Sequence, residues 1–409
     1  MTLAIEHPTA IIDASLNITG SKSESNRLLV LQALFPQIHL ENVSKSDDAQ
    51  VMQQALASKT PLKDVHHAGT TMRFLTAYYA TRPGFSVQLT GSQRMQERPI
   101  GILVDALRAL GASIHYEKNE GYPPLKVNGV ALSKSKVTLP ASVSSQYISA
   151  LMLIAPSLEN GLEITLEGPI TSVPYIKMTQ ALLGRIGVQT SFEGHEILVY
   201  PFSGPTEPQT LVVESDWSSA SYYYNIVALA KQARIVLTSY RNDSLQGDAV
   251  LQSLYRELGV QTNFTAQGVV LEKIPDFIPP TTVAFDLVNA PDIAQTIAVT
   301  CAGLGVGCEL TGLHTLKIKE TDRLVALENE LTKLGASITI THKSLHLSPG
   351  TVLKSNRSIP TYKDHRMALA FAPLGLKCPI MIEEAGVVSK SYPDFWNDLK
   401  LLGFQMQDV

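Results

Sequence analysis

The sequence predicts an α+β protein with two domains, each built from three copies of a small unit. Two observations support this prediction. First, 409 residues are too many for one ordinary hydrophobic core, so we expect two domains of roughly 200 residues. Second, five helical stretches end in Leu-Gly or Ile-Gly followed by a short β-prone run, at intervals of roughly 70 residues. The glycines are Gly111, Gly187, Gly259, Gly335 and Gly403.

The interval between these glycines indicates the size of the repeated unit. Glycine is common just past a helix end because it adopts the left-handed backbone found there. The interval is longer than a solenoid repeat and fits a small α+β unit. Counting back from Gly111 predicts one more helix end near residue 40. The helix-like stretch in that region is 48–58, and no Leu-Gly-strand run follows it. We therefore expect six units, three in each domain, with the first one truncated.

Apolar or alternating runs predict the strands, because successive side chains of a strand face opposite sides of its sheet. These runs lie at residues 15–19, 86–90, 162–166, 235–239, 309–313 and 380–383. Helices are expected over 28–34 and 48–58, and further helices begin where polar residues or proline mark a start. Those starts lie at residues 144–146, 172–175, 290–292, 319–323 and 392–394.

Composition and charge exclude several classes of protein. An apolar fraction of 44% is typical of a globular chain, and a formal net charge of −4 gives no general attraction to nucleic acid or to an anionic membrane. Trp217 and Tyr222–Tyr224 are expected in the core, because no basic face accompanies them. The first 15 residues lack the segments of a signal peptide, and the longest apolar stretch, 297–306, is too short to span a bilayer. We expect a cytoplasmic protein.

The sequence gives little indication of a metal or dinucleotide site. The three cysteines form neither a disulfide framework nor a C-x-x-C pattern. His66, His67 and His365 have no second ligand at helical spacing, so we expect no metal. The glycines at 303, 305 and 307 follow an apolar helix instead of a strand, so they predict a helix end and not a dinucleotide-binding turn.

Basic residues stand repeatedly at helix starts and in marked turns. The first case is the run Gly20-Ser21-Lys22-Ser23-Glu24-Ser25-Asn26-Arg27, in which Lys22 and Arg27 bracket a helix start. A helix start has unpaired N–H groups and a partial positive charge, so it can hold an anion. Further basic residues of this kind are Arg73, Arg98, Lys319, Arg323, Arg366 and Lys390. Each alone is more often a surface charge, but the set in an acidic chain predicts a small polyanionic substrate.

Two carboxylates, Asp292 and Glu320, stand in similar turns. A carboxylate near several cations stays ionised and can take a proton from a hydroxyl group. Capping of a helix start explains both residues equally well, so the residue pattern leaves the two interpretations open.

These motifs resemble those of the 5-enolpyruvylshikimate-3-phosphate (EPSP) synthase family, and the resemblance runs nearly end to end. It rests on the run at 20–27 and on several further runs of matching residues. They are Ala68-Gly69-Thr70-Thr71-Met72-Arg73, residues 94–101, Ser144-Ser145-Gln146, Ser172 with Pro174-Tyr175, Arg241-Asn242, Gln246-Gly247-Asp248, Pro291-Asp292, Lys319-Glu320-Thr321-Asp322-Arg323 and Asp364-His365-Arg366-Met367.

The resemblance implies the two-domain enolpyruvyl transferase fold, an inside-out α/β barrel with three βαβαββ units in each domain. One domain would comprise residues 1–19 and 215–409, and the other residues 20–214. The hinge would lie near 19–20 and 214–215. Helix starts would point into a cleft that closes on the substrates.

The resemblance also implies the reaction and its residues. The enolpyruvyl group of phosphoenolpyruvate would pass to the 5-hydroxyl of shikimate 3-phosphate in the shikimate pathway, with no cofactor, by a monomer. The shikimate 3-phosphate contacts would be Lys22, Ser23, Arg27, Ser144, Ser145, Gln146, Ser172, Tyr175, Asp292 and Lys319. The phosphoenolpyruvate contacts would be Lys22, Gly69, Arg98, Gln146, Arg323, Arg366 and Lys390. Asp292, Glu320 and Lys22 are the candidate catalytic residues.

The chain departs from the family pattern at three places. His66-His67 stands where Gly-Asn is usual, Thr315 stands near the place of an asparagine, and material is missing between Ser58 and Asp64. Two alternatives remain. A transferase acting on UDP-N-acetylglucosamine typically has Lys-Asn where this chain has Lys22-Ser23, and a loop cysteine that residues 94–100 lack. A non-catalytic anion-binding homologue would keep the cleft without turnover.

Overall fold

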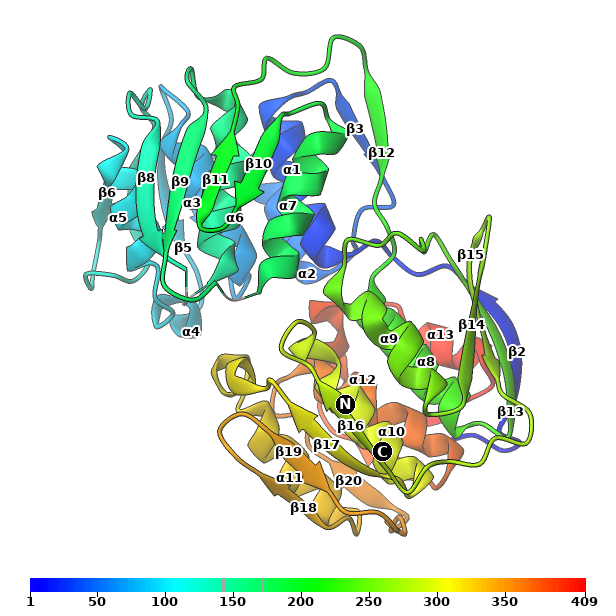
Figure 1. The fold of residues 1–409 in the computed structure, drawn as a ribbon. Helices are drawn as coiled ribbons and strands as arrows, with labels where there is room; N and C mark the ends of the chain where they lie inside the picture. Colours follow the sequence, from blue (N-terminus) through cyan, green and yellow to red (C-terminus); the bar gives the residue numbers. More distant parts are fainter. Residues whose placement is uncertain (142–143, 171) are drawn as a thin grey trace. The chain divides into compact units, whose positions relative to one another are not determined.

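The computed structural model describes residues 1–141, 144–170 and 172–409. The chain divides into two compact units (Figure 1). Unit 1 comprises Met1–Thr19 and Glu214–Val409, and unit 2 comprises Gly20–Val213. Within the described residues, the strands form six sheets, three in each unit, and five of the six have four strands. The expected α+β architecture of three sheet units per half is confirmed.

The sheet at β16 to β19 shows how a complete unit is built. Strand β16 (Thr282–Asp286) pairs in parallel with β17 (Gly307–Thr311), and β17 pairs antiparallel with β19 (Leu345–Leu347). Strand β18 (Ile338–Ile340) completes the sheet at its edge. Helix α10 (Ala294–Leu304) connects the parallel strands and α11 (Arg323–Lys333) leads to β18, which gives the βαβαββ order.

The other sheets of unit 1 repeat this pattern. One sheet contains β2 (Ile11–Leu16), β13 (Gln232–Thr238), β14 (Val260–Thr265) and β15 (Gly268–Lys273), with helices α8 (Trp217–Leu229) and α9 (Leu251–Arg256). The other contains β1 (Leu3–Glu6), β20 (Arg357–Ile359), β21 (Ile380–Ile382) and β22 (Gln405–Asp408), with helices α12 (His365–Phe371) and α13 (Phe395–Leu401). Strand β1 pairs with both β21 and β22, so the beginning of the chain supplies the fourth strand of the last unit.

Unit 2 has two complete sheets of the same pattern. The first contains β4 (Leu62–Asp64), β5 (Ser86–Thr90), β6 (Ser113–Tyr116) and β7 (Leu125–Asn128), with helices α3 (Gly69–Ala80), α4 (Gln93–Gln96) and α5 (Gly101–Ala109). The second contains β8 (Lys136–Pro140), β9 (Leu162–Glu167), β10 (Thr190–Glu193) and β11 (Glu196–Val199), with helices α6 (Ser145–Ile154) and α7 (Val173–Arg185).

The third sheet of unit 2 is the truncated one. It has two parallel strands, β3 (Ile38–Glu41) and β12 (Gln209–Val212), beside α1 (Lys22–Leu34) and α2 (Asp47–Ala57). The expected helix end near residue 40 is wrong, because β3 occupies that segment and α2 ends at Ala57. In the described chain the two antiparallel strands of a complete unit do not follow α2. The interval to the next helix end is therefore shorter than in the other units.

The five repeated glycines mark helix ends, as predicted. All of them have positive φ, between 85° and 108°. A residue with a Cβ is strained in that region, which explains the use of glycine. Three strand predictions were shifted. The strand expected at 235–239 is β13, which spans Gln232–Thr238. The strand expected at 15–19 is β2, which ends at Leu16 because its register with β13 ends at Leu237. The strand expected at 309–313 is β17, which spans Gly307–Thr311.

The core of unit 1 surrounds α8. Trp217 and Tyr222–Tyr224 are at most 2% exposed, which confirms their predicted core position. The hydroxyl groups of Tyr223 and Tyr392 form a hydrogen bond of 2.5 Å, and the Tyr255 hydroxyl pairs with Thr300 at 2.8 Å. Buried aromatic side chains of this kind usually find such a partner. The first bond joins α8 to the segment before α13, and the second joins α9 to α10. The beginning of α8 belongs to the site described next. No helix among the described residues is long and apolar enough to cross a membrane.

Candidate active site

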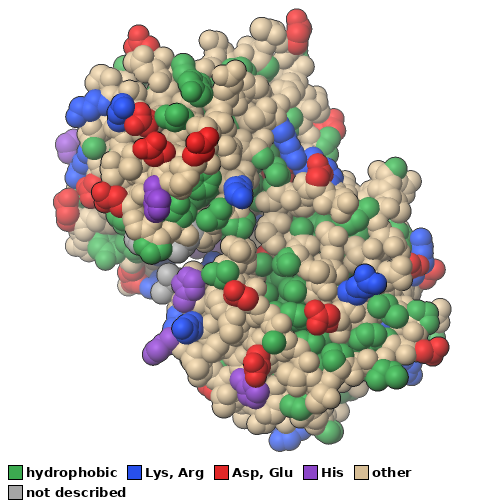
Figure 2. Space-filling view, viewed as in Figure 1, with side chains coloured by type: hydrophobic (Ala, Val, Ile, Leu, Met, Phe, Trp, Pro, Cys, Tyr) green, Lys and Arg blue, Asp and Glu red, His purple; other side chains and the backbone are tan. Residues whose placement is uncertain are grey.

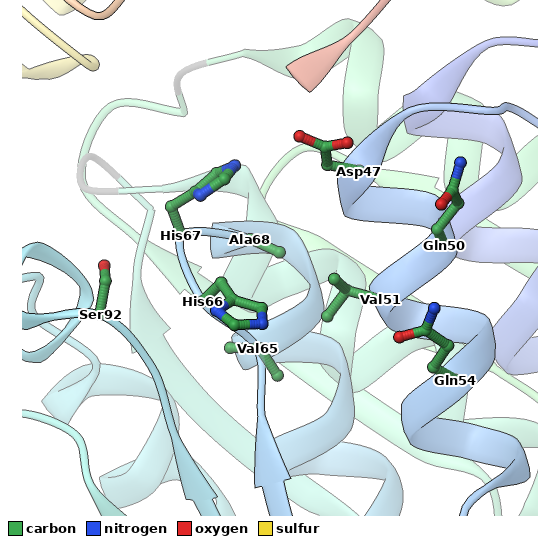
Figure 3. Close-up of a pocket in the computed structure, with 9 residues that line it drawn as sticks. All are labelled: Asp47, Gln50, Val51, Gln54, Val65, His66, His67, Ala68 and Ser92. Carbon is green, nitrogen blue, oxygen red and sulfur yellow. The ribbon is translucent and has the colours of Figure 1, made fainter. Parts of the chain in front are cut away.

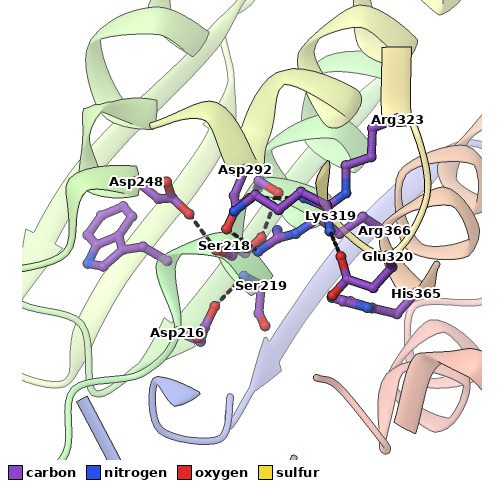
Figure 4. Close-up of polar contacts among 12 residues, drawn as sticks. Asp216, Ser218, Ser219, Asp248, Asp292, Lys319, Glu320, Arg323, His365 and Arg366 are labelled. Carbon is purple, nitrogen blue, oxygen red and sulfur yellow. Dashed lines mark hydrogen bonds and ion pairs between the residues drawn. The ribbon is translucent and has the colours of Figure 1, made fainter. Parts of the chain in front are cut away.

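In unit 1, polar side chains gather where four helical segments begin (Figure 4). They come from the beginnings of α8, α11 and α12 and from the 3-10 turn Pro291–Ile293 that precedes α10. Asp292 lies in the middle of this group. Its Oδ1 accepts a hydrogen bond from Arg323 Nη1 at 2.9 Å and lies 3.4 Å from Lys319 Nζ. Its Oδ2 accepts from Arg366 Nη2 at 3.1 Å. One carboxylate is therefore in contact with three cationic side chains.

Arg323 is the most buried cation of the cluster, with a side chain that is 2% exposed. Its Nε donates to Asp364 Oδ2 at 2.7 Å and its Nη2 to Glu320 Oε2 at 2.8 Å. Burial alone lowers the pKa of Arg323, but Asp364, Glu320 and Asp292 raise it above its ordinary value. Arg323 is thus a fixed cation, with carboxylates arranged around it.

Arg366 lies at the second position of α12 and is 7% exposed. Its Nη2 donates to Asp292 and also to the Ser218 hydroxyl, at 3.3 Å. Burial alone lowers the pKa of Arg366, whereas Asp292 and the other acidic neighbours raise it well above its ordinary value. Its Nε is buried without a hydrogen-bond partner among the described residues. A buried guanidinium with an unused donor is suited to an anionic ligand.

The remaining predicted residues of unit 1 lie at the edge of this cluster. Lys319 is 34% exposed and Glu320 33% exposed, so both carry part of their charge at the surface. Lys390 Nζ donates to the backbone carbonyl of Lys363 at 2.8 Å, next to Asp364 in the chain. The structure therefore brings together Asp292, Lys319, Glu320, Arg323 and Arg366, and places Lys390 at the neighbouring turn.

In unit 2, Arg27 connects the second turns of four helices. Its Nε donates to Thr179 of α7 at 2.8 Å, and its Nη2 to Ser149 of α6 at 3.0 Å. Its guanidinium lies 5.5 Å from the ring centroid of Phe74 in α3. All of these positions fall within the first two turns of their helices, so α1, α3, α6 and α7 begin on the same side of unit 2. Burial lowers the pKa of Arg27 to about 10.

Several of these helix starts leave their first N–H groups without a side-chain cap. The side chains of the N-cap residues Ser21 of α1 and Ser172 of α7 accept no hydrogen bond from their helices, and Ala68 of α3 has no side chain that could do so. Such N–H groups attract anions. Around these starts lie the predicted substrate residues Lys22, Ser23, Gly69, Ser144, Ser145, Gln146 and Tyr175.

Arg98 and Gln146 connect further helix starts. The Arg98 guanidinium lies against Gly69, at the first residue of α3. Gln146 Nε2 donates to Thr70 Oγ1 at 3.3 Å, which joins the beginning of α6 to that of α3. Arg73, another basic residue noted in the sequence, is 4% exposed and donates to the backbone carbonyls of Gly69 and Pro99. Arg73 therefore braces the turn, and burial with the nearby charge of Arg98 lowers its pKa to about 10.

The two histidines that depart from the family pattern line a pocket of about 360 Å³ in unit 2 (Figure 3). Helix α2 forms one wall through Asp47, Gln50 and Gln54, and the turn with His66 and His67 forms another. The pocket thus lies along α2, the second helix of the truncated unit. Thr315, the other departure, lies in the 3-10 turn His314–Ile318, and its buried Oγ1 has no hydrogen-bond partner among the described residues.

The surface agrees with the modest net charge. On the face drawn in Figure 2, basic and acidic side chains are interspersed. Groups of three or more His, Cys, Asp or Glu side chains that could hold a metal ion do not occur among the described residues.

Comparison with known proteins identifies the family. The family model described as EPSP synthase (3-phosphoshikimate 1-carboxyvinyltransferase) matches residues 53–399. The chain belongs to the EPSP synthase family. It is 47% identical over 398 residues to the 3-phosphoshikimate 1-carboxyvinyltransferase of Bacteroides fragilis strain YCH46, covering 96% of each chain. It is 34% identical over 426 residues to the enzyme of that name from Tolumonas auensis, covering 97% of each.

Solved structures show the same fold. EPSP synthase from Acinetobacter baumannii superimposes with a TM-score of 0.81 at 20% identity, covering all of both chains. The enolpyruvyl transferase NikO from Streptomyces tendae superimposes with a TM-score of 0.74 at 15% identity, covering 100% of this chain and 99% of NikO. The enolpyruvyl transferase fold expected from the sequence motifs is confirmed.

Three residues of the unit 1 cluster, Asp364, Asp248 and Ser218, have no role predicted from the sequence. Asp364 is fully buried against Arg323, and it also accepts a hydrogen bond from the Arg366 backbone N–H at 2.8 Å. Asp248 accepts a hydrogen bond from the Ser218 hydroxyl, and Ser218 also binds Arg366. Asp364 and Asp248 belong to motifs that this chain shares with the EPSP synthase family, and that membership was the signal in the sequence for a functional role. Ser218 stood in none.

Proposed function

We propose that this chain carries out the reaction for which its family is named. It transfers the enolpyruvyl group of phosphoenolpyruvate to the 5-hydroxyl of shikimate 3-phosphate and releases phosphate. The observation that carries this proposal is the position of Asp292, whose carboxylate contacts Lys319, Arg323 and Arg366. A proton acceptor and an anion clamp thereby occupy one cluster, and an addition to phosphoenolpyruvate needs both.

The phosphoenolpyruvate clamp consists of arginine and lysine side chains. Arg323 and Arg366 are held by carboxylates in unit 1, and Arg98 lies over Gly69 in unit 2. Guanidinium groups bind phosphate and carboxylate through paired N–H donors, so fixed arginines suit this substrate. Lys390, Lys22 and Gln146 complete the proposed set.

Shikimate 3-phosphate is bound by hydroxyl groups and helix starts. Uncapped N–H groups at α1 and α7 support phosphate binding there. The proposed contacts are Lys22, Ser23, Arg27, Ser144, Ser145, Gln146, Ser172, Tyr175, Asp292 and Lys319. Arg27 contributes its positive charge and holds the local backbone, because its Nη1 also donates to the Ser23 carbonyl at 2.8 Å.

The reaction is an addition followed by an elimination. The 5-hydroxyl attacks C2 of phosphoenolpyruvate while C3 receives a proton, and phosphate then leaves from the tetrahedral intermediate. Asp292 takes the hydroxyl proton. The three cations that contact its carboxylate keep it ionised, as a proton acceptor must be. Glu320, together with Lys22, supplies and removes the proton at C3.

The cations stabilise the charge of the leaving phosphate, and the scheme involves no net redox change. We further propose that units 1 and 2 are domains with boundaries near residues 19–20 and 214–215, and that the enzyme acts as a cytoplasmic monomer.

Phosphate release from phosphoenolpyruvate tests the function. Purified enzyme is assayed alone, with shikimate 3-phosphate, and with UDP-N-acetylglucosamine. Release that depends on shikimate 3-phosphate is the expected result. Phosphate release that depends on UDP-N-acetylglucosamine instead would show that this sugar nucleotide is the acceptor substrate. Ligand binding by calorimetry without release in either assay would identify a binding-only homologue.

A further inference from the structure

The Ser218 hydroxyl lies between Asp248 and the proposed substrate clamp. Ser218 is the second residue of α8, and its Oγ donates to Asp248 Oδ2. The same Oγ accepts a hydrogen bond from Arg366 Nη2 at 3.3 Å (Figure 4). Asp248, in the 3-10 turn Gly247–Val250, is 8% exposed. Three segments distant in sequence therefore meet at one hydroxyl group.

The chemistry of the three groups fixes the direction of these hydrogen bonds. A guanidinium can only donate and an ionised carboxylate can only accept, whereas a serine hydroxyl has one proton and two lone pairs. The hydroxyl proton of Ser218 must therefore point to Asp248, which leaves a lone pair for Arg366. Asp248 thus sets the orientation of the group that binds the arginine.

The Nη2 group of Arg366 is fully used by this arrangement. It has two N–H bonds, one directed to Ser218 and the other to Asp292 Oδ2. A planar guanidinium held at two points by one nitrogen cannot rotate freely, so its other N–H groups take a fixed direction. Asp292 alone would supply one of these points, and Ser218 supplies the second.

Because Asp248 is buried, it is not simply a solvated charge on a surface turn. Its side chain has the Ser218 hydroxyl as its hydrogen-bond partner and forms no ion pair within 4.0 Å among the described residues. Placing a carboxylate in this environment costs free energy unless another interaction compensates. The nearby Arg366 supplies that compensation through Ser218.

We propose that Ser218 and Asp248 are positioning residues, which hold the Arg366 guanidinium in the orientation that binds phosphoenolpyruvate. The proposal rests on the proposed function, because it assigns Arg366 to that substrate. Neither residue touches the substrate in this account. Asp248 orients Ser218, and Ser218 orients Arg366.

Steady-state kinetics of Ser218→Ala test the proposal. The loss of one hydrogen bond to a charged group predicts a rise of about tenfold in the KM for phosphoenolpyruvate. The KM for shikimate 3-phosphate should change by less than about twofold, because Arg366 does not bind that substrate. Ser218→Thr keeps the hydroxyl and should restore the wild-type KM. Ser253→Ala, on α9, makes the same chemical change outside the cluster and is the matched control.

Combined variants separate positioning from general damage to the structure. Asp248→Ala should resemble Ser218→Ala, and the double variant should be no worse than either single variant, because both act through Arg366. In an Arg366→Ala background, Ser218→Ala should have no further effect. An equal rise in both KM values, or a Ser218→Ala effect that persists without Arg366, would overturn the proposal.

The proposed function can fail separately. If the wild-type enzyme releases no phosphate, phosphoenolpyruvate binding by calorimetry is measured with the same variants. Weaker binding of Ser218→Ala but not of Ser253→Ala would then still support the positioning role, and equal binding would reject it. If wild-type turnover is normal and Ser218→Ala has wild-type kinetics, the positioning role alone is rejected.

Discussion

The guanidinium of Arg98 lies directly against the Cα of Gly69, at the first residue of α3. A Cβ built on Gly69 would lie 2.5 Å from Arg98 Nη1 and 2.7 Å from Nη2. A Cβ atom does not approach another heavy atom so closely, so any residue with a Cβ must displace the arginine. The absence of a side chain at Gly69 therefore allows a cation to lie over an uncapped helix start.

Gly69→Ala should weaken phosphoenolpyruvate binding. The new methyl group displaces Arg98, so we expect a rise of about tenfold in the KM for phosphoenolpyruvate, equivalent to about 1.4 kcal/mol, and a smaller change for shikimate 3-phosphate. Gly184→Ala in α7 is the matched control, because a Cβ there meets no atom within 4 Å. Steady-state kinetics measure both variants. An unchanged KM for phosphoenolpyruvate in Gly69→Ala would remove Arg98 from the clamp.

Asp292→Asn should separate catalysis from binding. The amide keeps the shape and one acceptor but lacks the charge that receives a proton. We therefore expect kcat to fall by about 10²- to 10⁴-fold, the usual contribution of a general base. Calorimetry should still detect both ligands. Asp286→Asn, at the end of β16, is an exposed control. Turnover near that of the wild type would exclude Asp292 as the proton acceptor.

Asp364→Asn should destabilise the fold. Asp364 and Arg323 form a pair whose side chains are 0% and 2% exposed, so the variant leaves a buried guanidinium with less compensating charge. Removal of one partner of such a pair typically lowers the free energy of unfolding by ~3–5 kcal/mol. Because asparagine can still accept a hydrogen bond from Arg323, we expect a loss near the lower figure. Denaturant unfolding measures the change.

Asp322→Asn is the control for that prediction. Asp322 caps α11 through the backbone N–H groups of Leu324 and Val325. Asparagine caps a helix about as well as aspartate, so its unfolding free energy should stay near that of the wild type. Equal stability of both variants would show that the Arg323–Asp364 charge pair contributes nothing to the fold.

Asp248→Asn should remove a pH dependence of stability. Burial, with the repulsion of Asp292, raises the pKa of Asp248 from 3.8 to about 6. The folded state therefore binds a proton that the unfolded state has released, and this stabilisation is full below about pH 4 and is lost as pH rises through about 6. A shift of this size corresponds to ~3 kcal/mol.

The unfolding free energy of Asp248→Asn relative to the wild type should thus increase between about pH 4 and pH 7. Asp13→Asn, at an exposed position in β2, should show no such increase. A difference between Asp248→Asn and wild type that does not vary with pH would mean that Asp248 titrates at its ordinary value.

The repeated architecture was predictable because its signal is local. Each of the five glycines ends a helix with positive φ, and that requirement is visible in the sequence itself. The pairing of β1 with β22 was not predictable in this way, because Leu3 and Asp408 stand at opposite ends of the chain. The interrupted glycine spacing before Gly111 correctly indicated that the first unit is truncated. The helix end expected near residue 40 was wrong, because nothing in the local sequence gives the length of the segment that the first unit lacks.

The charged residues of the site could be predicted as a set, but their individual roles could not. Arg73 and Arg323 both stand in marked turns. The structure shows Arg73 bracing backbone carbonyls and Arg323 held by three carboxylates. The partners Pro99, Asp292 and Asp364 come from distant segments, so only the folded chain distinguishes a bracing arginine from one in the proposed clamp. Ser218 carries no charge, and its link to Arg366 depends entirely on tertiary packing.

The most direct test of this account is phosphorus NMR of a mixture of the purified enzyme with phosphoenolpyruvate and shikimate 3-phosphate. If the chain is the transferase, the phosphoenolpyruvate signal is replaced by that of inorganic phosphate, while a new phosphate monoester signal replaces that of shikimate 3-phosphate. A sample without shikimate 3-phosphate should show no change. Persistence of both substrate signals with active, folded enzyme would contradict enolpyruvyl transfer to this acceptor.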